Sequence, residues 1–256
     1  MMMGKPLLLS GAITGGVLAV VFSWPPTSGT TPAAVSSSIA VISPSFFRTV
    51  SPTPTNTPTP LPSVEILESE INLDVPFTMQ APNQNWNLPY QEFCEEASMV
   101  MAAAYTQGKK TLTPAEADQL MLNVMDYENE TFGYYKDTTA AETAEILRNY
   151  FQLQDVRLVN NPTEQDFKQA LSENKIILVP AAGQLLGNPN FRAPGPPYHM
   201  LVIKGYTSTG QFITNDPGTR KGADYPYSAD VILEAMHDWN NGDVESGQKV
   251  AIIVGR

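Results

Sequence analysis

Three residue types in this sequence have the chemistry of a nucleophilic site. Cys94 is the only cysteine among 256 residues, and it lies in the stretch NLPYQEFCEEASMVMAAAY. Histidine occurs twice, as His199 in GPPYHMLVIKGY and as His237 in ILEAMHDWNNG. A thiol becomes a strong nucleophile when a neighbouring imidazole takes its proton, and a carboxylate commonly fixes the tautomer of that imidazole. The sequence therefore raises the question of which histidine, and which carboxylate, could serve Cys94.

His199 is the stronger of the two candidates. It starts an apolar, strand-like run after a proline-rich loop, and Asp216 follows 17 residues later in FITNDPGTR. If the two runs form a hairpin about the turn TSTG, the start of the first strand lies beside the end of the second. Asp216 would then accept a ring N–H of His199. His237 falls near the end of the last predicted helix, where a histidine commonly has a structural role.

The residues after Cys94 predict that it starts a helix. From Cys94 to about Tyr105 the chain is rich in alanine, methionine and glutamate, which are good helix formers. Free N–H groups in a first helical turn stabilise a thiolate. Glu95 and Glu96 would raise the thiol pKa, but successive helix positions diverge by about 100°, so neither carboxylate need face the sulfur. The alternative is that Cys94 is a buried packing residue.

An acyl-transfer site also needs hydrogen-bond donors for the developing oxyanion. The backbone N–H of Cys94 is one candidate. Side-chain amides upstream of it are Gln80, Asn83, Gln84 and Asn85. Gln80 is favoured because it follows a strand-like run, which would fix its position.

The elements that must hold these residues indicate an α+β fold. Helices are predicted at 111–128, 138–151 and 162–174, with Thr113, Thr139 and Thr163 as N-caps; Glu116 and Glu142 are expected to close capping boxes at the first two. Strands are predicted at 175–181, 199–206, 211–216 and 249–256, with a last helix at 227–239. We expect the helical half to pack on an antiparallel sheet.

The N-terminal region divides into two segments ahead of the globule. Residues 1–24 contain an apolar stretch after Lys5 and predict a signal peptide or a membrane anchor. In residues 25–63, 25 of 39 positions are proline, serine or threonine, so residues 25–64 predict a disordered linker or stalk. This order favours a catalytic domain at 65–256 that is exported, either anchored at the outer face of a membrane or secreted.

Charge and cysteine content exclude several classes of partner and site. Two of the 15 basic residues, Lys5 and Arg48, lie before residue 65, which leaves 13 basic residues against 26 acidic ones. Such a domain repels phosphate backbones, so nucleic acid is not expected as a partner. Membrane contact is expected only through the N-terminal segment. One cysteine forms no internal disulfide, and without a Cys/His cluster we expect no metal and no cofactor.

Several motifs resemble a known family. VPFTMQAP, CEEASMVMAAAY, LVPAAGQLLGNPNF, PGPPYHMLVIKGY and FITNDPGTRKG are similar to the papain-like domain of the bacteriocin-processing cysteine peptidases, the thirty-ninth family of cysteine peptidases. The likeness covers about residues 70–256 and is closer to the stand-alone, exported branch. It implies a papain-like fold and four roles: Gln80 in the oxyanion hole, Cys94 as nucleophile, His199 as general base and acid, and Asp216 as its orienting partner.

The sequence departs from the family at the nucleophile. Many members have Cys-Gly-Pro or Asp-Cys-Gly where this chain has Cys94-Glu95-Glu96, and the interval of 14 residues from Gln80 to Cys94 is longer than in the leader peptidases. Three functions therefore stay open. They are an exported thiol hydrolase that cleaves a peptide or amide bond, a non-catalytic domain that binds peptides or cell wall, and a cell-wall peptide amidase. The expected substrate is a peptide, a protein or a cell-wall peptide.

Overall fold

A computed structural model describes residues 67–256 of the chain. The chain divides into two units, Met1–Pro60 and Leu61–Arg256, and the described residues all belong to the second. The anchor or signal peptide expected at 1–24 and the linker expected at 25–64 lie outside the described residues. Within residues 67–256, no helix is long and apolar enough to cross a bilayer.

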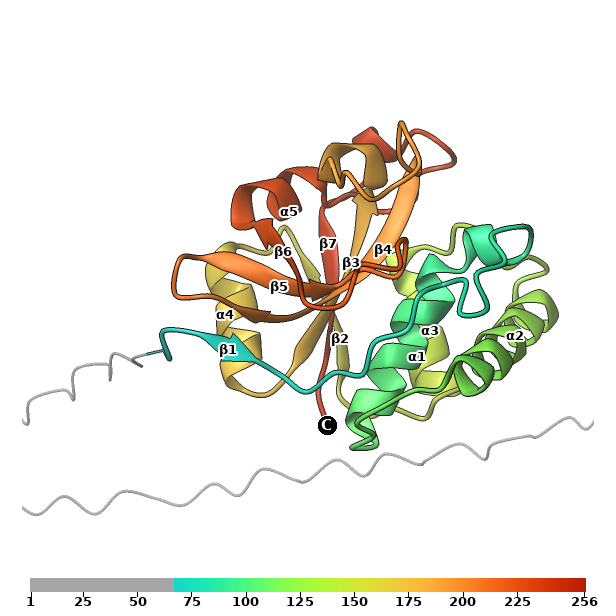
Figure 1. The fold of residues 1–256 in the computed structure, drawn as a ribbon, viewed down its shortest axis with the longest axis horizontal. Coiled ribbons are helices and arrows are strands. Elements are labelled where there is room, and N and C mark those ends of the chain that lie inside the picture. The colour runs from blue at the N-terminus through green and yellow to red at the C-terminus, as the bar shows by residue number, and fades with distance from the viewer. Residues whose placement is uncertain (1–66) are drawn as a thin grey trace, which may run out of the picture. The chain divides into compact units, whose positions relative to one another are not determined.

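One antiparallel sheet forms the centre of the described unit (Figure 1). Its strands run in the order β2-β7-β3-β4-β5-β6, and β1 adds to one end of β4. The strand bounds are Ile71–Asn72 (β1), Val156–Asn160 (β2), Ile176–Ala182 (β3), Tyr198–Tyr206 (β4), Gln211–Asn215 (β5), Tyr225–Ser228 (β6) and Val250–Val254 (β7). The β4–β5 hairpin about TSTG, on which the pairing of His199 with Asp216 depends, is confirmed.

Five α-helices and three short 3-10 helices accompany the sheet in residues 67–256. The α-helices are Cys94–Thr106 (α1), Pro114–Thr131 (α2), Ala140–Asn149 (α3), Glu164–Ser172 (α4) and Ala229–Ala235 (α5). The 3-10 helices are Tyr90–Glu92 (η1), Gly183–Leu186 (η2) and Val244–Ser246 (η3). The predicted α+β class and the start of a helix at Cys94 are therefore confirmed, whereas β1, β2 and β6 were not predicted.

Threonine caps fix where three of these helices begin. Thr113, Thr139 and Thr163 each accept a backbone N–H from the third helical residue. Glu142 closes the expected capping box at α3. Glu116 does not close one at α2, because its carboxylate pairs with Lys109 instead. Lys109 lies in the loop between α1 and α2, where its flexible side chain reaches Glu116.

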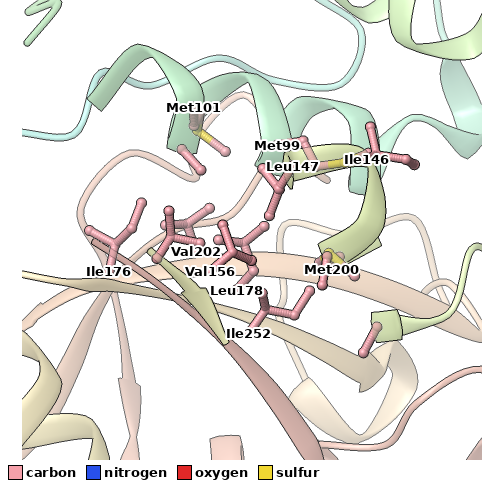
Figure 2. Close-up of a cluster of buried hydrophobic side chains, with 14 of the residues drawn as sticks. Met99, Met101, Ile146, Leu147, Val156, Ile176, Leu178, Met200, Val202 and Ile252 are labelled. Carbon is pink, nitrogen blue, oxygen red and sulfur yellow. The ribbon is translucent and has the colours of Figure 1, made fainter. Parts of the chain in front are cut away.

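The two faces of the sheet carry separate hydrophobic clusters. Along β4, Met200 and Val202 face α1 and α3, whereas Leu201 and Ile203 belong to the cluster that includes residues of α4 and α5. Alternation of this kind is the two-residue period of a strand buried on both faces. Figure 2 shows the first cluster, in which Met99 of α1 lies above the strands near Met200. Helices thus cover both sides of β4, the strand that carries His199.

Helix α1 is the most enclosed helix of the unit. Its residues from Cys94 to Tyr105 are all buried, because it packs against the sheet and also against α2 and α3. Small alanine side chains at 102–104 allow that close approach on several sides. A helix held in this way places its first residue, Cys94, at a fixed position relative to β4.

Gly205→Ala tests how tightly β1 is held on the sheet. Gly205 of β4 pairs with Asn72, and an added Cβ would lie on the carbonyl oxygen of Ile71, well inside van der Waals contact. We expect the free energy of unfolding, measured by urea denaturation, to fall by about 1–3 kcal/mol, as for other overpacked sites. Ser208→Ala, in the exposed turn that follows β4, is the control and should leave it within about 0.5 kcal/mol. An unchanged value for Gly205→Ala would contradict this account.

Candidate active site

His199 and Asp216 form a buried pair at the end of the β4–β5 hairpin. Nε2 of His199 lies 2.8 Å from Oδ1 of Asp216, and the side chains are 1% and 0% exposed. His199 is the second residue of β4, and Asp216 directly follows β5, so antiparallel pairing brings the two positions together. Because Nε2 is engaged by the carboxylate, Nδ1 is the ring nitrogen left for proton transfer.

Asp216 accepts hydrogen bonds from four donors. Besides His199, its donors are the Tyr227 hydroxyl at 2.7 Å, the Asn188 amide at 3.1 Å and the Gly218 backbone N–H at 3.0 Å. Burial alone would raise the pKa of Asp216, but the charge and hydrogen bond of His199, joined by the bonds from Tyr227 and Gly218, hold this pKa below its ordinary value. The carboxylate is therefore ionised at neutral pH and stabilises a protonated imidazole.

Asn188 and Tyr227 are site residues that the sequence reasoning missed. Asn188 also donates to Tyr227 at 2.7 Å, which links the two groups beneath Asp216. Asn188 lies in the motif GNPNF, which was part of the family resemblance but had no assigned role. Tyr227 comes from β6, a strand that was not predicted, so the sequence gave no reason to place it near Asp216.

Loop packing holds the imidazole of His199 in place. The Phe191 ring meets it edge to face, with 5.2 Å between the ring centroids. Gly218 lies so close that a Cβ there would be 2.9 Å from Cε1 of His199, and one on Gly183 would be 3.0 Å from its Cβ. Absence of these two side chains allows the loops after β3 and β5 to close over the ring.

Cys94 begins α1 next to β4, but its thiol is bonded elsewhere. Sγ donates to Oε2 of Glu95 at 2.8 Å, and the side chain is 7% exposed. The backbone N–H of Met200, the residue after His199, also acts on the sulfur and lowers its pKa. Within residues 67–256, no hydrogen bond joins Cys94 to His199. The structure thus brings His199 and Asp216 together and leaves Cys94 beside their strand, bonded to Glu95.

The bond to Glu95 answers a point that the sequence left open. Helix geometry did not require either glutamate to face the sulfur, but the Glu95 side chain folds back along the first turn of α1 to reach Sγ. Burial raises the pKa of the Cys94 thiol well above its ordinary value, and the charge and hydrogen bond of Glu95 raise it further. These effects exceed the stabilisation that free N–H groups at a helix start give a thiolate.

Glu95 belongs to a cluster of three buried acids with Glu96 and Glu128, each at most 1% exposed. Burial raises the pKa of Glu95 to about 8, and burial together with the charge of Glu95 raises that of Glu128 to about 9. Burial, then the charge of Glu128, raises the pKa of Glu96. The carboxylate oxygens of Glu96 and Glu128 are buried without a hydrogen-bond partner within residues 67–256, which favours the protonated form of both groups.

Gln80 is buried near the segment that leads into Cys94, with its amide already engaged. Its Nε2 donates to the carbonyl oxygens of Tyr90 at 3.0 Å and Gln91 at 2.9 Å, both in η1. The backbone N–H of Gln80 donates to Pro217 at 3.0 Å. Gln80 therefore ties η1 to the loop after Asp216. In this geometry, donation to an oxyanion requires one of the two amide bonds to break.

A cavity of about 990 Å³ is lined by residues that contact His199, although neither His199 nor Cys94 lines it. Its lining includes Gln80 and Gln91 on one side, and Phe191 and Gly218, which both contact His199, on the other. Trp86 adds an exposed aromatic ring. A cavity of this size accommodates several residues of an extended peptide.

His237 lies apart from this site. It was predicted near the end of the last helix, but α5 ends at Ala235, because Met236 turns into an extended conformation and bridges to Ala181 of β3. Nδ1 of His237 bonds the Gly247 carbonyl at 3.0 Å. The bond to the Gly247 carbonyl agrees with the structural role expected for His237.

Comparisons with known proteins identify one family. The model of the Peptidase_C39 like family matches residues 72–242. Among solved structures, a Bacillus anthracis protein described as a C39-like peptidase matches with 14% identity and a TM-score of 0.49, covering 73% of this chain and 98% of its own. A fragment of prointerpain A from Prevotella intermedia matches with 14% identity and a TM-score of 0.47, covering 74% of each chain. No curated protein matched.

Glu95→Gln tests whether the carboxylate suppresses the thiol. Above about pH 8, where Glu95 becomes charged, removal of that charge should lower the pKa of Cys94, and each unit of decrease gives about tenfold more thiolate at a fixed pH below it. We expect faster alkylation by iodoacetamide between about pH 8 and 9, measured by mass spectrometry of the Cys94 peptide. Glu96→Gln is the matched control and should have a smaller effect, since Glu96 acts on the thiol only through weaker charge repulsion. Equal rates in wild type and Glu95→Gln would refute this assignment.

Stability should fall as the pH rises, because of the three buried acids. An unfolded glutamate ionises near its ordinary pKa of 4.5, whereas Glu95 and Glu128 in the native state keep their protons up to about pH 8 and 9. Between these limits each retained proton lowers the free energy of unfolding by about 1.4 kcal/mol per pH unit. Glu128→Gln should make the slope from pH 5.5 to 7.5 shallower by about that amount. Glu130→Gln, at an exposed position of the same helix, is the control and should leave the slope unchanged. A slope for Glu128→Gln equal to that of wild type would disprove the account.

Proposed function

Because this chain belongs to the Peptidase_C39 like family, we propose that it is an exported thiol hydrolase that cleaves a peptide or amide bond. Support comes first from the buried His199–Asp216 pair, which stands beside a peptide-sized cavity and on the strand that packs against the start of α1. Export, with the N-terminal segment as signal peptide or anchor, is part of the same proposal and rests on the sequence pattern of residues 1–64.

In the proposed reaction, the Cys94 thiol first leaves Glu95 by rotation about its Cα–Cβ bond. Nδ1 of His199 takes the thiol proton, and Sγ attacks the carbonyl carbon of the substrate. Asp216, held by four donors, keeps the ring oriented and stabilises its positive charge. The imidazolium then gives its proton to the leaving amine as the carbon–nitrogen bond breaks, which leaves a thioester. Water, deprotonated by the same imidazole, hydrolyses the thioester and returns the thiol.

Two donors are proposed for the oxyanion. The first is the backbone N–H of Cys94, which lies at the start of α1 and points out of the helix. The second is the amide of Gln80, once substrate in the cavity takes one of its two N–H groups from the carbonyls of η1. Asp216 and His199 need no such change, since their bond is already formed.

A second function, peptide binding without hydrolysis, is favoured by the bond from Cys94 to Glu95. In this arrangement the thiol is bonded to Glu95 and its pKa is raised, so at neutral pH it keeps its proton and is not a nucleophile. The two functions differ in whether the thiol shifts from Glu95 to His199 when a substrate is present. A reaction with substrate therefore separates them, whereas ligand-free geometry does not.

Substitution of the two histidines provides the test. The full chain is incubated with a proteome-derived peptide library and, separately, with cell-wall peptide fragments, and new N-termini are identified by mass spectrometry. We expect cleavage by wild type, none by Cys94→Ala, and a rate at least about 100-fold lower for His199→Ala, the usual loss of a general base. His237→Ala is the control and should stay within about twofold.

Circular dichroism confirms that each variant is folded. Absence of cleavage by wild type in both mixtures, together with equal alkylation of Cys94 in wild type and His199→Ala, would exclude the hydrolase and leave the binding function. Cleavage of cell-wall fragments alone would identify the enzyme as a cell-wall peptide amidase.

A further inference from the structure

The cavity beside His199 has a charge opposite to that of its domain. Three basic residues contribute to its lining, Arg192 from the loop before β4 and Arg220 and Lys221 from the loop after β5. None of the residues that line it is aspartate or glutamate. Residues 65–256 contain 26 acidic residues and 13 basic ones, so a random sample of surface would be acidic. The basic residues are therefore concentrated where a substrate would bind.

These three cations have no acidic partner in the described part of the chain. No ion pair among residues 67–256 includes Arg192, Arg220 or Lys221. Arg220 donates only to the neutral amide oxygen of Gln84, 3.3 Å away on the opposite wall. Five of the other ten basic residues in this range pair with carboxylates: Lys109, Lys110, Lys168, Lys175 and Lys204. The charges in the cavity are thus available to an incoming anion.

The basic residues belong to the two loops that hold the imidazole. Arg192 directly follows Phe191, whose ring contacts His199, and Arg220 and Lys221 come two and three residues after Gly218, which closes over the same ring. Two carboxylates lie nearby without lining the cavity. That of Asp216 is buried and bonded to His199 and to the Gly218 N–H, and that of Glu92 accepts from the Gln91 amide at 2.8 Å. A cationic wall within a few residues of the imidazole would act on substrate groups close to the bond that is cleaved.

We propose that this cavity selects peptides that carry acidic side chains beside the scissile bond. Guanidinium groups match carboxylates in shape and charge, and Trp86 and Phe191 add apolar surface for the rest of the peptide. Repulsion from the acidic surface outside the cavity keeps such a peptide from binding elsewhere, so the cavity is the favourable place for it. This inference rests on the proposed hydrolase and specifies its substrate.

The test compares cleavage sites between two charge-matched triple variants of the full chain. Arg192→Gln/Arg220→Gln/Lys221→Gln removes the cations of the cavity. Lys110→Gln/Arg157→Gln/Lys168→Gln removes the same charge from residues that do not line it. Each protein digests the peptide library, and the frequency of aspartate and glutamate within four residues of each cleaved bond is counted. We expect at least about fivefold enrichment for wild type and the control, and loss of the enrichment in the cavity variant, with neutral sites still cleaved.

Three outcomes separate this inference from the hydrolase proposal. Cleavage without acidic enrichment, or with enrichment that persists in the cavity variant, overturns the inference and leaves the hydrolase standing. If wild type cleaves nothing and Cys94 is alkylated equally in wild type and His199→Ala, the hydrolase fails. Immobilised full-length Cys94→Ala is then used to capture peptides from the same library at 50 mM and 500 mM salt. Capture of acidic peptides at low salt, and its loss when the three cavity cations are also replaced, supports the charge selection. Capture of peptides without regard to their charge refutes it.

Discussion

The hydrogen bond from Cys94 to Glu95 is the contact on which the state of the thiol depends. Glu95 keeps its own proton up to about pH 8, so it accepts this hydrogen bond without taking the proton of the thiol. In the proposed reaction the thiol exchanges the bond for one to the His199 imidazole, on the strand that packs against α1. The side chains of Glu95 and His199 are both buried, and the low dielectric constant around them strengthens whichever hydrogen bond the thiol makes. In the proposed hydrolase, a thiol bonded to Glu95 would be unreactive and one bonded to the imidazole would be a nucleophile. Glu95 would then give the enzyme a resting state that ends when the thiol rotates towards His199.

Stability and chemistry are linked through the same three acids. A buried carboxyl group keeps its proton, because ionisation would leave a charge without solvent. Glu95, Glu96 and Glu128 are therefore stable in the core only while they are largely protonated, and the protonated Glu95 has its own proton to donate. Alkaline conditions that would generate a thiolate also charge these acids, which weakens the fold around α1. The buried acids thus limit the range of pH in which the helix can present a reactive sulfur.

Local signals in the sequence predicted the main helices, the β4–β5 hairpin and the contact between His199 and Asp216. Threonine caps and the TSTG turn determine local structure over a few residues. Once a hairpin forms, the start of its first strand lies beside the end of its second, whatever the sequence. Tyr227 was not predicted to matter because β6 was not predicted, although Asp216 lies only 11 residues before it. Asn188 and Glu128 were missed because the groups that act on them are distant in sequence. The contact of Glu95 with the sulfur was left open for a different reason: helix geometry fixes the Cβ direction, while rotation about two further bonds brings the carboxylate back to the sulfur.

Charge distribution explains how an acidic domain accommodates a carboxylate-bearing substrate. Acidic surface raises the energy of a negatively charged peptide everywhere near the protein, and the effect extends over about 8 Å at physiological salt. Arg192, Arg220 and Lys221 are exposed side chains that line the cavity, and no aspartate or glutamate lines it with them. Phe191 and Gly218 line the same cavity and contact His199. A carboxylate on a bound peptide would therefore meet attractive charges close to the loops that hold the imidazole, and that attraction would weaken as salt is added.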